Sequence, residues 1–541
     1  MALVIPPVAK ACEPEPSVLV LAGHLKGKGI EARLFDVNLL VQELLLMPAA
    51  LLESGKELSG SMRTSARRAA GRASTAFQEL TGPAAYTDYR KYGSAINSLM
   101  EGFKAVSRGS GCRVTPSDFV HPSLSPLSSE DLARAAALPE LMPTRAPLEA
   151  AALEILAADP RIIGISLTYI SQALHAWALA GILRNRGFTG PLILGGAMLT
   201  SWAGKLTPDS PALSAWDALI IGPGEQILEV VAKTGRIPDM GGVLSPGNGI
   251  WKPACKPDAE VGFLPEWRTL DWSRYPSPGG ILPVAASRGC YWARCAFCPE
   301  ADTAYIPAKA EALARVLLEA HEVGGVANVH FTDNALSPSH LRAFSGHFAN
   351  RAIGWYGFAR LESTLDEPGF MEALARGGCR MLQLGIETAS QRLLEKMGKG
   401  TTIELADRIV RRAFDAGIRV YGYFLFGMVG ETEEEARKTL DWIRERENFL
   451  TFLNLSIMNL PEAGIISSSP ERYGLADISR LDDFNDLSLY VGHSGGGGMD
   501  RRAVRGLLGE ARKDPVIRPM LGRTPRGFTS NHAAFAPLKG F

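Results

Sequence analysis

The most constraining feature of the sequence is a cluster of three cysteines within nine residues, at Cys290, Cys295 and Cys298. The chain of 541 residues has seven cysteines, too few and too unevenly spaced for a disulfide scaffold. Three thiolates on one loop can ligate three irons of a [4Fe–4S] cluster. No fourth cysteine lies nearby, because Cys255 is 35 residues upstream and Cys379 is 81 residues downstream. One iron would then stay open to a substrate or cofactor.

Two alternatives compete with an open-site cluster. A zinc site would need a fourth Cys or His at suitable spacing, and none is close in the sequence. Three free buried thiols would not explain the glycine and aromatic neighbours of this loop, Gly289, Tyr291 and Trp292. We therefore expect all three cysteines to be metal ligands on an exposed loop.

Residues 281–460 alternate between short apolar runs and helical patterns, and the cysteine loop follows the first apolar run. The expected strands are 281–286, 329–332, 354–358, 381–384, 419–424 and 452–458, and the expected helices are 308–323, 338–350, 368–375, 403–416 and 433–444. Six strands alternating with helices predict a partial (β/α)6 barrel of the TIM type. The functional residues of such a barrel lie at the carboxyl ends of its strands, where the cysteine loop falls.

Residues 1–238 show a second alternation of strands and helices. The expected strands cover 3–5, 31–35, 162–167, 192–194 and 218–221, and the helical patterns include 17–28 and 173–185. Short apolar strands between helices predict an α/β domain with a doubly wound parallel sheet, flavodoxin-like or Rossmann-like. Such sheets bind ligands at the carboxyl ends of their strands.

Three further segments complete the organisation. Residues from about 39 to 155 interrupt the first alternation and are rich in Ala, Leu, Arg and Ser, which predicts a helical cap or docking subdomain. Residues 239–280 form a linker rich in Pro, Gly and Trp. The C-terminal segment, 461–541, loses the alternation and contains four consecutive glycines, 495–498. No helix with a Lys opens after them, so we expect a flexible loop rather than a phosphate cradle.

The charge balance bounds the class of partner. Lys plus Arg and Asp plus Glu both total 57, so the net charge gives no electrostatic case for binding nucleic acid or an acidic membrane. The most apolar stretch, Leu39–Leu52, is interrupted by polar residues and is too short to span a bilayer. The N-terminus lacks the basic region of a signal peptide. We expect a cytoplasmic monomer without a nucleic-acid or membrane partner.

The cysteine loop resembles that of the radical S-adenosylmethionine (SAM) enzymes. Their usual spacing is C-x3-C-x2-C, and this chain has one extra residue between Cys290 and Cys295. Spacing variants exist in the superfamily, so the extra residue affects the shape of the loop more than the assignment. The resemblance implies one [4Fe–4S] cluster, with SAM bound at its open iron.

The resemblance continues at the strand ends that follow. It implies that Phe297 lies against the SAM adenine and that Asp333 meets the amino group, although the usual motif there is Gly-Gly-Glu. Arg360 is expected at the SAM carboxylate, Glu387 at the ribose, and Gly427 on the adenine side. Each match alone is weak, but five matches occur in the right order.

The first domain resembles the cobalamin-binding domain that precedes the barrel in the B12-dependent radical SAM class. Glycines at strand ends let the backbone approach a large flat ligand, and hydroxyls can bind its nucleotide tail or amides. The alternative is a degenerate flavodoxin-like domain that binds nothing. The matching residues are Pro6, Pro7, Asp36, Ser166, Thr168, Gly195, Gly196, Gly222, Gly224 and Glu225.

One cobalamin motif is missing. No Asp is followed two positions later by His, so the D-x-H-x-x-G motif that replaces the lower base of cobalamin is absent from the sequence. His24 lies in a helical context and is expected to be a surface or partly packed residue rather than a cobalt ligand. Many members of the class lack the motif, so we expect cobalamin bound base-off without a histidine ligand.

The resemblance implies a methyltransferase that acts on an unactivated carbon of a natural product or peptide. The cluster, reduced by a donor such as flavodoxin or ferredoxin, would generate the radical, and cobalamin would carry the methyl group. A cobalamin-dependent radical cyclase or rearrangement enzyme would share every motif. A non-catalytic cobalamin-binding protein is the third possibility, and the intact Cys290, Cys295 and Cys298 argue against it.

Overall fold

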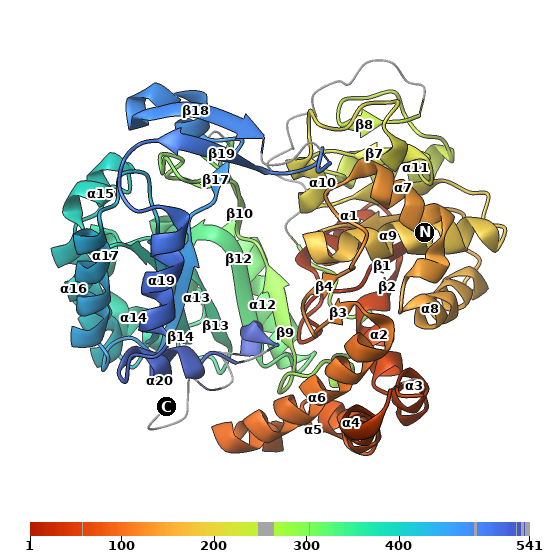
Figure 1. Ribbon diagram of the computed structural model, residues 1–541, viewed down its shortest axis with the longest axis horizontal. Helices are drawn as coiled ribbons and strands as arrows, with labels where there is room; N and C mark the ends of the chain where they lie inside the picture. The colour runs from red at the N-terminus through yellow and green to blue at the C-terminus, as the bar shows by residue number, and fades with distance from the viewer. Residues whose placement is uncertain are drawn as a thin grey trace.

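A computed structural model describes residues 1–56, 58–246, 264–301, 303–480, 484–525, 527–531 and 535. Its strands form two separate six-stranded sheets, each with its own helices, together with smaller antiparallel pairs and a three-stranded sheet (Figure 1). The two larger sheets correspond to the two alternations expected from the sequence. Cys255 lies outside the described residues.

The N-terminal sheet has the strand order β2-β1-β5-β6-β7-β8. The first five strands in this order are parallel to one another, and β8 is antiparallel to β7. The parallel part has the flavodoxin order, in which a ligand crevice opens where the order reverses, here between β1 and β5. This confirms the doubly wound parallel sheet. The strands are β1 (Ala2–Ile5), β2 (Arg33–Asp36), β5 (Ile163–Ser166), β6 (Leu192–Gly195), β7 (Ala218–Ile220) and β8 (Val243–Leu244).

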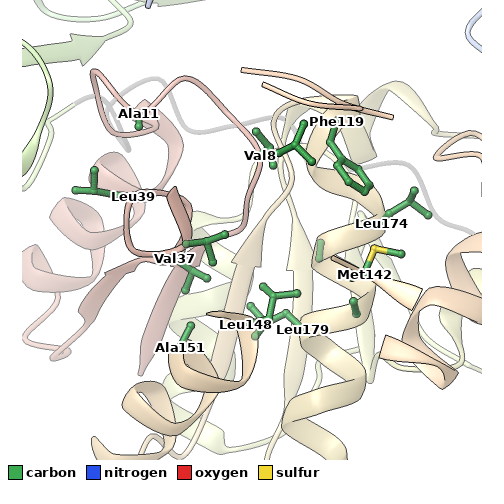
Figure 2. Packing of buried hydrophobic residues seen from close by; sticks show 14 of the residues in the cluster. Val8, Ala11, Val37, Leu39, Phe119, Met142, Leu148, Ala151, Leu174 and Leu179 are labelled. Atoms are coloured by element: carbon green, nitrogen blue, oxygen red, sulfur yellow. The ribbon is translucent and has the colours of Figure 1, made fainter. Parts of the chain in front are cut away.

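Helices cover both faces of this sheet, because successive side chains of each strand point to opposite faces. Leu3 packs in a cluster with residues of α1 (Pro16–Gly27) and α11 (Glu225–Thr234). Val4 packs instead in the larger cluster with residues of α8 (Arg145–Ala157) and α9 (Ala173–Asn185). Figure 2 shows part of that cluster, in which Leu148 and Leu179 of the two helices meet.

The segment between β2 and β5 is largely helical. Its helices α2, α7 and α8 pack close to the first sheet, since α2 contacts α8 and both α7 and α8 contact α9. The remaining helices, α3 to α6, pack on one another and lie below the sheet in Figure 1. The elements are α2 (Val37–Leu45), α3 (Pro48–Ser54), α4 (Gly60–Ala70), α5 (Ala73–Glu79), α6 (Tyr89–Ser110), β3 (Arg113–Val114), β4 (Phe119–Val120) and α7 (Ser129–Ala137). No single helix in the described ranges has the length and apolarity to cross a bilayer. Taken together, α2 and α3 meet these two criteria, but the pair is bent by 67° at the break between them.

The second large sheet has the order β16-β15-β14-β13-β12-β9, and every neighbouring pair is parallel. Strands therefore follow one another in sequence order, as in a barrel, and helices cover the outside. This confirms the partial barrel. Its strands are β9 (Ile281–Val284), β12 (Asn328–Leu336), β13 (Gly354–Ala359), β14 (Cys379–Glu387), β15 (Arg419–Phe426) and β16 (Phe452–Ile457), and its main helices are α12 (Ala310–Glu322), α13 (Pro338–His347), α14 (Phe370–Arg376), α15 (Gln391–Lys396), α16 (Ile403–Asp415) and α17 (Glu433–Glu445).

Alternation along the strands divides the barrel into an outer and an inner face. Trp355 and Leu382 belong to the core shared with the surrounding helices. Their neighbours Tyr356 and Met381 join a second cluster with Ile281, Tyr421 and Phe452, which fills the lumen toward the amino ends of the strands. The lumen is therefore closed at that end by apolar and aromatic side chains.

The C-terminal segment covers the other end. The sheet β17-β19-β18 stands beyond the carboxyl ends of the barrel strands (Figure 1). The connection before β19 reaches the N-terminal domain, where Leu487 N donates to Leu127 O at 2.9 Å and Ser129 N donates to Asp486 at 2.8 Å. The elements are β17 (Leu460–Pro461), β18 (Leu475–Arg480), β19 (Tyr490–Gly495), α19 (Arg501–Ala511) and α20 (Ile517–Gly522).

The run of four glycines passes close to neighbouring backbone, although a Cβ at Gly497 would meet nothing within 4 Å. A Cβ at Gly498 would lie 2.4 Å from the backbone oxygen of Glu431, and one at Gly496 would lie 2.7 Å from Val429. All four glycines have positive φ. The sequence led us to expect a flexible loop, because glycine runs are typical of linkers; here the missing side chains let two backbone segments approach.

A buried junction joins the N-terminal loop, the barrel and the end of the chain. Ser530 Oγ donates to Glu13 at 2.7 Å, and Tyr356 OH donates to Ser530 O at 3.0 Å. Glu13 also pairs with His330 of β12 at 3.0 Å and with Lys10. The charge of the buried Glu13 is thus compensated by the ammonium group of Lys10, and His330 adds a hydrogen bond.

Candidate active site

The cysteine loop connects two short antiparallel strands, β10 (Ser287–Arg288) and β11 (Ile306–Pro307), directly after the carboxyl end of β9. Cys290, Cys295 and Cys298 are all half-buried and free. Burial raises the pKa of Cys298 to about 11 and also raises the pKa of Cys295 above its ordinary value. The other thiols of the loop raise both pKa values further, so the three sulfurs lie within each other's electrostatic range.

The donor set fits a cluster better than a single ion. Within the described ranges, no group of three or more His, Cys, Asp or Glu side chains could hold a metal ion. In a cubane each thiolate ligates a different iron, so the three sulfurs need not converge on one point. Three neighbouring thiols on a half-buried loop match that requirement, and a bound metal would keep them deprotonated despite their raised pKa values.

The cysteine loop rests on residues 397–400, the turn between α15 and α16. Ala296 N donates to Met397 O at 2.8 Å, and Trp292 Nε1 donates to Gly398 O at 2.9 Å. Gly400 has φ +68°, and a Cβ there would lie 2.0 Å from the Trp292 ring. Sequence reasoning missed this turn, although its Gly-Lys-Gly stretch between two helical patterns was the available signal.

Arg360 connects the end of β13 to this loop. Its guanidinium donates to Lys399 O at 2.6 Å and to Cys295 Sγ at 3.7 Å. It also pairs with Glu362 at 3.1 Å and lies 4.1 Å from the centre of the Trp292 ring. The residue is 7% exposed. The structure therefore places Arg360 at the cysteine loop, where protein atoms accept hydrogen bonds from three nitrogens of its guanidinium group.

Glu387 lies at a bulge of β14 and has φ +67°, unusual for a residue with a side chain. Its carboxylate accepts from Lys399 Nζ at 2.7 Å. Gly385 makes room for this pair, because a Cβ there would lie 2.5 Å from Glu387 Oε1. Lys399 Nζ also lies 5.7 Å from the centre of the Phe297 ring. Two of the residues expected around SAM, Glu387 and Phe297, are thus brought together by Lys399.

Asp333 is buried at the carboxyl end of β12. It accepts from Ser287 Oγ at 2.6 Å and from Ala286 N at 2.8 Å. Burial raises its pKa, and these two hydrogen bonds oppose the rise. The carboxylate therefore fixes the base of the cysteine loop to the neighbouring strand.

Gly427 follows β15, and its backbone N–H is held by the side chain of Glu431, a residue that sequence reasoning did not select. Glu431 accepts from Gly427 N and, at 3.3 Å, from Met428 N. Its side chain is fully buried, and burial raises its pKa to about 7. Residues 427–431, with the sequence Gly-Met-Val-Gly-Glu, thus form a turn that closes on its own glutamate.

The crevice between β1 and β5 carries hydroxyls and one unexpected acid. Ser166 Oγ and Ser17 Oγ are 2.8 Å apart, and Thr168 Oγ1 donates to Glu15 at 2.7 Å. Gln172 also donates to Glu15. Burial raises the pKa of Glu15 to about 8. Both predicted hydroxyls therefore lie at the switch point of the sheet, beside a glutamate that sequence reasoning missed.

The glycines of the N-terminal sheet end β6 and follow β7. Gly196 has φ +114°, and a Cβ there would lie 2.3 Å from Leu167 O, so only glycine fits. Gly222 has φ +92° and donates its N–H to Thr200 at 3.0 Å. A Cβ at Gly195 or Gly224 would make only ordinary contacts of 3.7 Å. These two positions leave backbone open at the edge where a ligand would bind.

An ion pair between Glu225 and Arg288 brings the two candidate sites together. Glu225 is 5% exposed and lies in the first turn of α11, directly after the glycines that follow β7. Arg288 lies two residues before Cys290. The carboxyl edge of the N-terminal sheet therefore faces the cysteine loop at the mouth of the barrel.

His24 is placed away from that edge. It lies in the last turn of α1, and its Nε2 is 3.1 Å from Glu229 of α11. Because α1 begins at the carboxyl edge of the sheet and runs back along it, its last turn lies toward the opposite edge. His24 therefore has the packed, partnered environment expected of a structural residue.

Comparison with known proteins agrees with this architecture. Residues 284–443 match the model of the Radical SAM superfamily. An uncharacterized methyltransferase of Pyrococcus horikoshii is 26% identical over 53% of this chain and 64% of its own length. The tryptophan 2-C-methyltransferase of Streptomyces laurentii is 28% identical over 38% of this chain and 37% of its own length. The chain thus spans less than two thirds of these curated relatives.

Solved structures extend the likeness to both domains. The cobalamin-dependent SAM radical enzyme OxsB superposes with a TM-score of 0.59 at 14% identity, over 94% of this chain and 66% of that chain. The radical SAM methyltransferase TsrM from Kitasatospora setae, with tryptophan and a SAM analogue bound, gives 0.52 at 17% identity, over 89% and 79%. The chain therefore shares its overall fold with the OxsB and TsrM structures, and the match to the Radical SAM superfamily falls on the barrel.

Proposed function

We propose that this chain is a cobalamin-dependent radical SAM C-methyltransferase. The observation that carries the proposal is the Glu225–Arg288 ion pair, which sets the ligand edge of a flavodoxin-type sheet against a loop of three cysteines. Bound there, the three cofactors would supply one-electron reduction, radical generation and methyl transfer. Two relatives carry methyltransferase names, which supports the reaction class.

The cluster and SAM belong to the mouth of the barrel in this proposal. Cys290, Cys295 and Cys298 ligate the cluster and leave one iron for SAM. Phe297, Asp333, Arg360, Glu387 and Gly427 surround SAM, and the structure gives each of these side chains or amides a partner at the same end of the barrel.

Cobalamin occupies the carboxyl edge of the N-terminal sheet. Ser166 and Thr168 bind its polar groups at the switch point, while the glycines after β6 and β7 let its flat surface approach the backbone. The cofactor would be bound base-off, without a histidine ligand to cobalt. Electron paramagnetic resonance of the bound Co(II) form should lack nitrogen superhyperfine splitting. A triplet splitting contradicts this, and His24→Ala and His330→Ala would then test the protein donors.

The substrate enters the barrel lumen. Phe358 and Tyr423 lie with ring centres 4.9 Å apart, one strand layer above the apolar floor. Gln383 donates to Tyr423 OH at 2.9 Å, while its buried Oε1 has no partner among the described atoms. This lining suits a small molecule or peptide side chain with an unsaturated group and a hydrogen-bond donor. A flavodoxin-like or ferredoxin-like donor supplies the electron.

A second function shares the same site. The anaerobic magnesium-protoporphyrin IX monomethyl ester cyclase of Rubrivivax gelatinosus is 23% identical over 48% of this chain and 50% of its own length. A radical cyclase or rearrangement enzyme would use the same cluster and SAM residues.

Labelled SAM separates the two functions. The reconstituted enzyme with cobalamin, reductant and CD3-SAM should form S-adenosylhomocysteine, and a metabolite extract should yield a product that carries the CD3 group. Formation of 5′-deoxyadenosine and product without S-adenosylhomocysteine favours the cyclase. Replacing the three cysteines of the loop by Ala should abolish both the cluster and SAM cleavage; full iron content in that variant contradicts the assignment.

A further inference from the structure

Arg360 has a set of contacts that are all made to the cysteine loop or to its supports. Its guanidinium lies over the ring of Trp292 and donates to Cys295 Sγ, while Lys399 O and Glu362 hold the rest of the fork. Glu362 is itself fixed by Tyr291 OH at 2.9 Å. The loop and the 397–400 turn together hold this cation against one cysteine sulfur.

A fixed cation beside a ligand sulfur has an electronic consequence. Reduction of a [4Fe–4S] cluster adds one electron and makes the cluster one charge more negative. Hydrogen bonds to the sulfurs and nearby charge set the reduction potential of such clusters. A guanidinium cannot lose its proton, so its positive charge persists at every working pH.

We propose that Arg360 is a positioning residue that acts on the cluster through Cys295 and raises its reduction potential. Arg360 therefore makes the one-electron reduction of the cluster easier. The inference rests on the proposed function only for the cluster itself, since it is argued from the contacts of Arg360 with the cysteine loop and its supports. This effect on the cluster is separate from a contact of Arg360 with the SAM carboxylate, which would act on SAM binding.

The test is a redox titration of the full chain, reconstituted anaerobically with iron and sulfide and containing no SAM or cobalamin. Dithionite with redox mediators supplies the electron, and electron paramagnetic resonance of the reduced cluster reports the midpoint. Arg360→Met keeps the length of the side chain and removes the charge. This substitution should lower the equilibrium constant for one-electron reduction of the cluster about tenfold, which corresponds to a fall in its midpoint potential of about 59 mV. The midpoint potential should fall less in Arg360→Lys, because the lysine keeps the positive charge.

Matched variants keep the test decisive. Arg446 also stacks on a tryptophan, Trp442 at 4.5 Å, and pairs with Asp407 at 2.6 Å, but lies among the outer helices. Arg446→Met should leave the midpoint unchanged. Glu362→Gln removes the charge that partly neutralises Arg360, so it should raise the midpoint.

Each result has a clear reading. An unchanged midpoint in Arg360→Met, with weaker SAM binding, overturns the proposal and favours the carboxylate role. If Arg360→Met loses iron, the sign of the shift in Glu362→Gln decides, and an unchanged or lower midpoint overturns the proposal. Absence of a [4Fe–4S] signal in the wild-type chain would instead refute the proposed function, before any variant is compared.

Discussion

Replacing Gly400 by Ala should test whether the 397–400 turn supports the cysteine loop, apart from the backbone strain that the substitution itself causes. Gly400 has φ +68°, and an added Cβ would lie 2.0 Å from the Trp292 ring, well inside the 3.4 Å at which ordinary contact begins. The ring would have to withdraw by more than about 1 Å in a close-packed site. That movement breaks the hydrogen bond from Trp292 Nε1 to Gly398 O and shifts the loop that carries the cysteines.

The chain contains a matched control for the backbone term. Gly417 also has a left-handed conformation, with φ +78°, and an added Cβ there meets nothing within 4 Å. Either substitution costs about 1–2 kcal/mol for placing a side chain in that conformation. Gly400→Ala alone adds the lost hydrogen bond, about 1 kcal/mol, and the displacement of Trp292.

The assay is iron and sulfide content after anaerobic reconstitution, together with the urea midpoint of unfolding. Gly417→Ala should lower the urea midpoint and still bind a full cluster. Gly400→Ala should lower the midpoint further and lose most of its iron. Equal stability loss with full iron content in both variants would refute the idea that the 397–400 turn holds the cysteine loop.

Two further predictions concern the N-terminal domain. Arg288→Met leaves Glu225 buried without its ion-pair partner, so the free energy of unfolding should fall by about 3 kcal/mol. Arg315→Met, which breaks an exposed ion pair, should leave the free energy of unfolding unchanged. Equal urea midpoints for the two variants would contradict a stabilising role of the Glu225–Arg288 pair. Glu15 has its pKa raised from the ordinary 4.5 to about 8, so the folded state holds this proton more tightly and loses stability as the pH rises from about 5 to 8. In Glu15→Gln that loss should be smaller, and identical pH profiles of urea unfolding in wild type and variant would show that Glu15 is not protonated in the folded chain.

The sequence was sufficient for the parallel strands of both sheets because each of them carried its own signal. The antiparallel strand β8 (Val243–Leu244) was missed, since it lies in the segment expected to be a linker. Apolar runs ending in glycine, such as the one before Gly195, predicted a parallel sheet whose carboxyl edge gathers those ends. The position of the cysteines directly after the first barrel strand placed their loop at the barrel mouth for the same reason. Patterns local to one segment were enough for these features.

The remaining parts of the site depend on contacts between distant segments. Lys399 contacts Glu387 and Phe297 only because the 397–400 turn folds under the cysteine loop, which lies about a hundred residues earlier in the chain. Glu15 is likewise set beside Thr168 by strand order, 153 residues apart in the sequence. Periodicity and motif spacing carry no information about such pairs, so the supporting residues could not be selected in advance.

The buried junction around Ser530 imposes an order on biosynthesis. Ser530 binds Glu13, 517 residues earlier, and its backbone oxygen accepts from Tyr356 in the barrel. During translation the N-terminal sheet and the barrel emerge first and can each fold as a unit. The carboxylate of Glu13 can contact His330 and Lys10 before Ser530, 517 residues later in the chain, has been synthesised. The contacts of Ser530 therefore form only after both units have been synthesised, and a chain shortened before Ser530 would keep the Glu13–His330 pair but lack the serine that binds Glu13 and Tyr356.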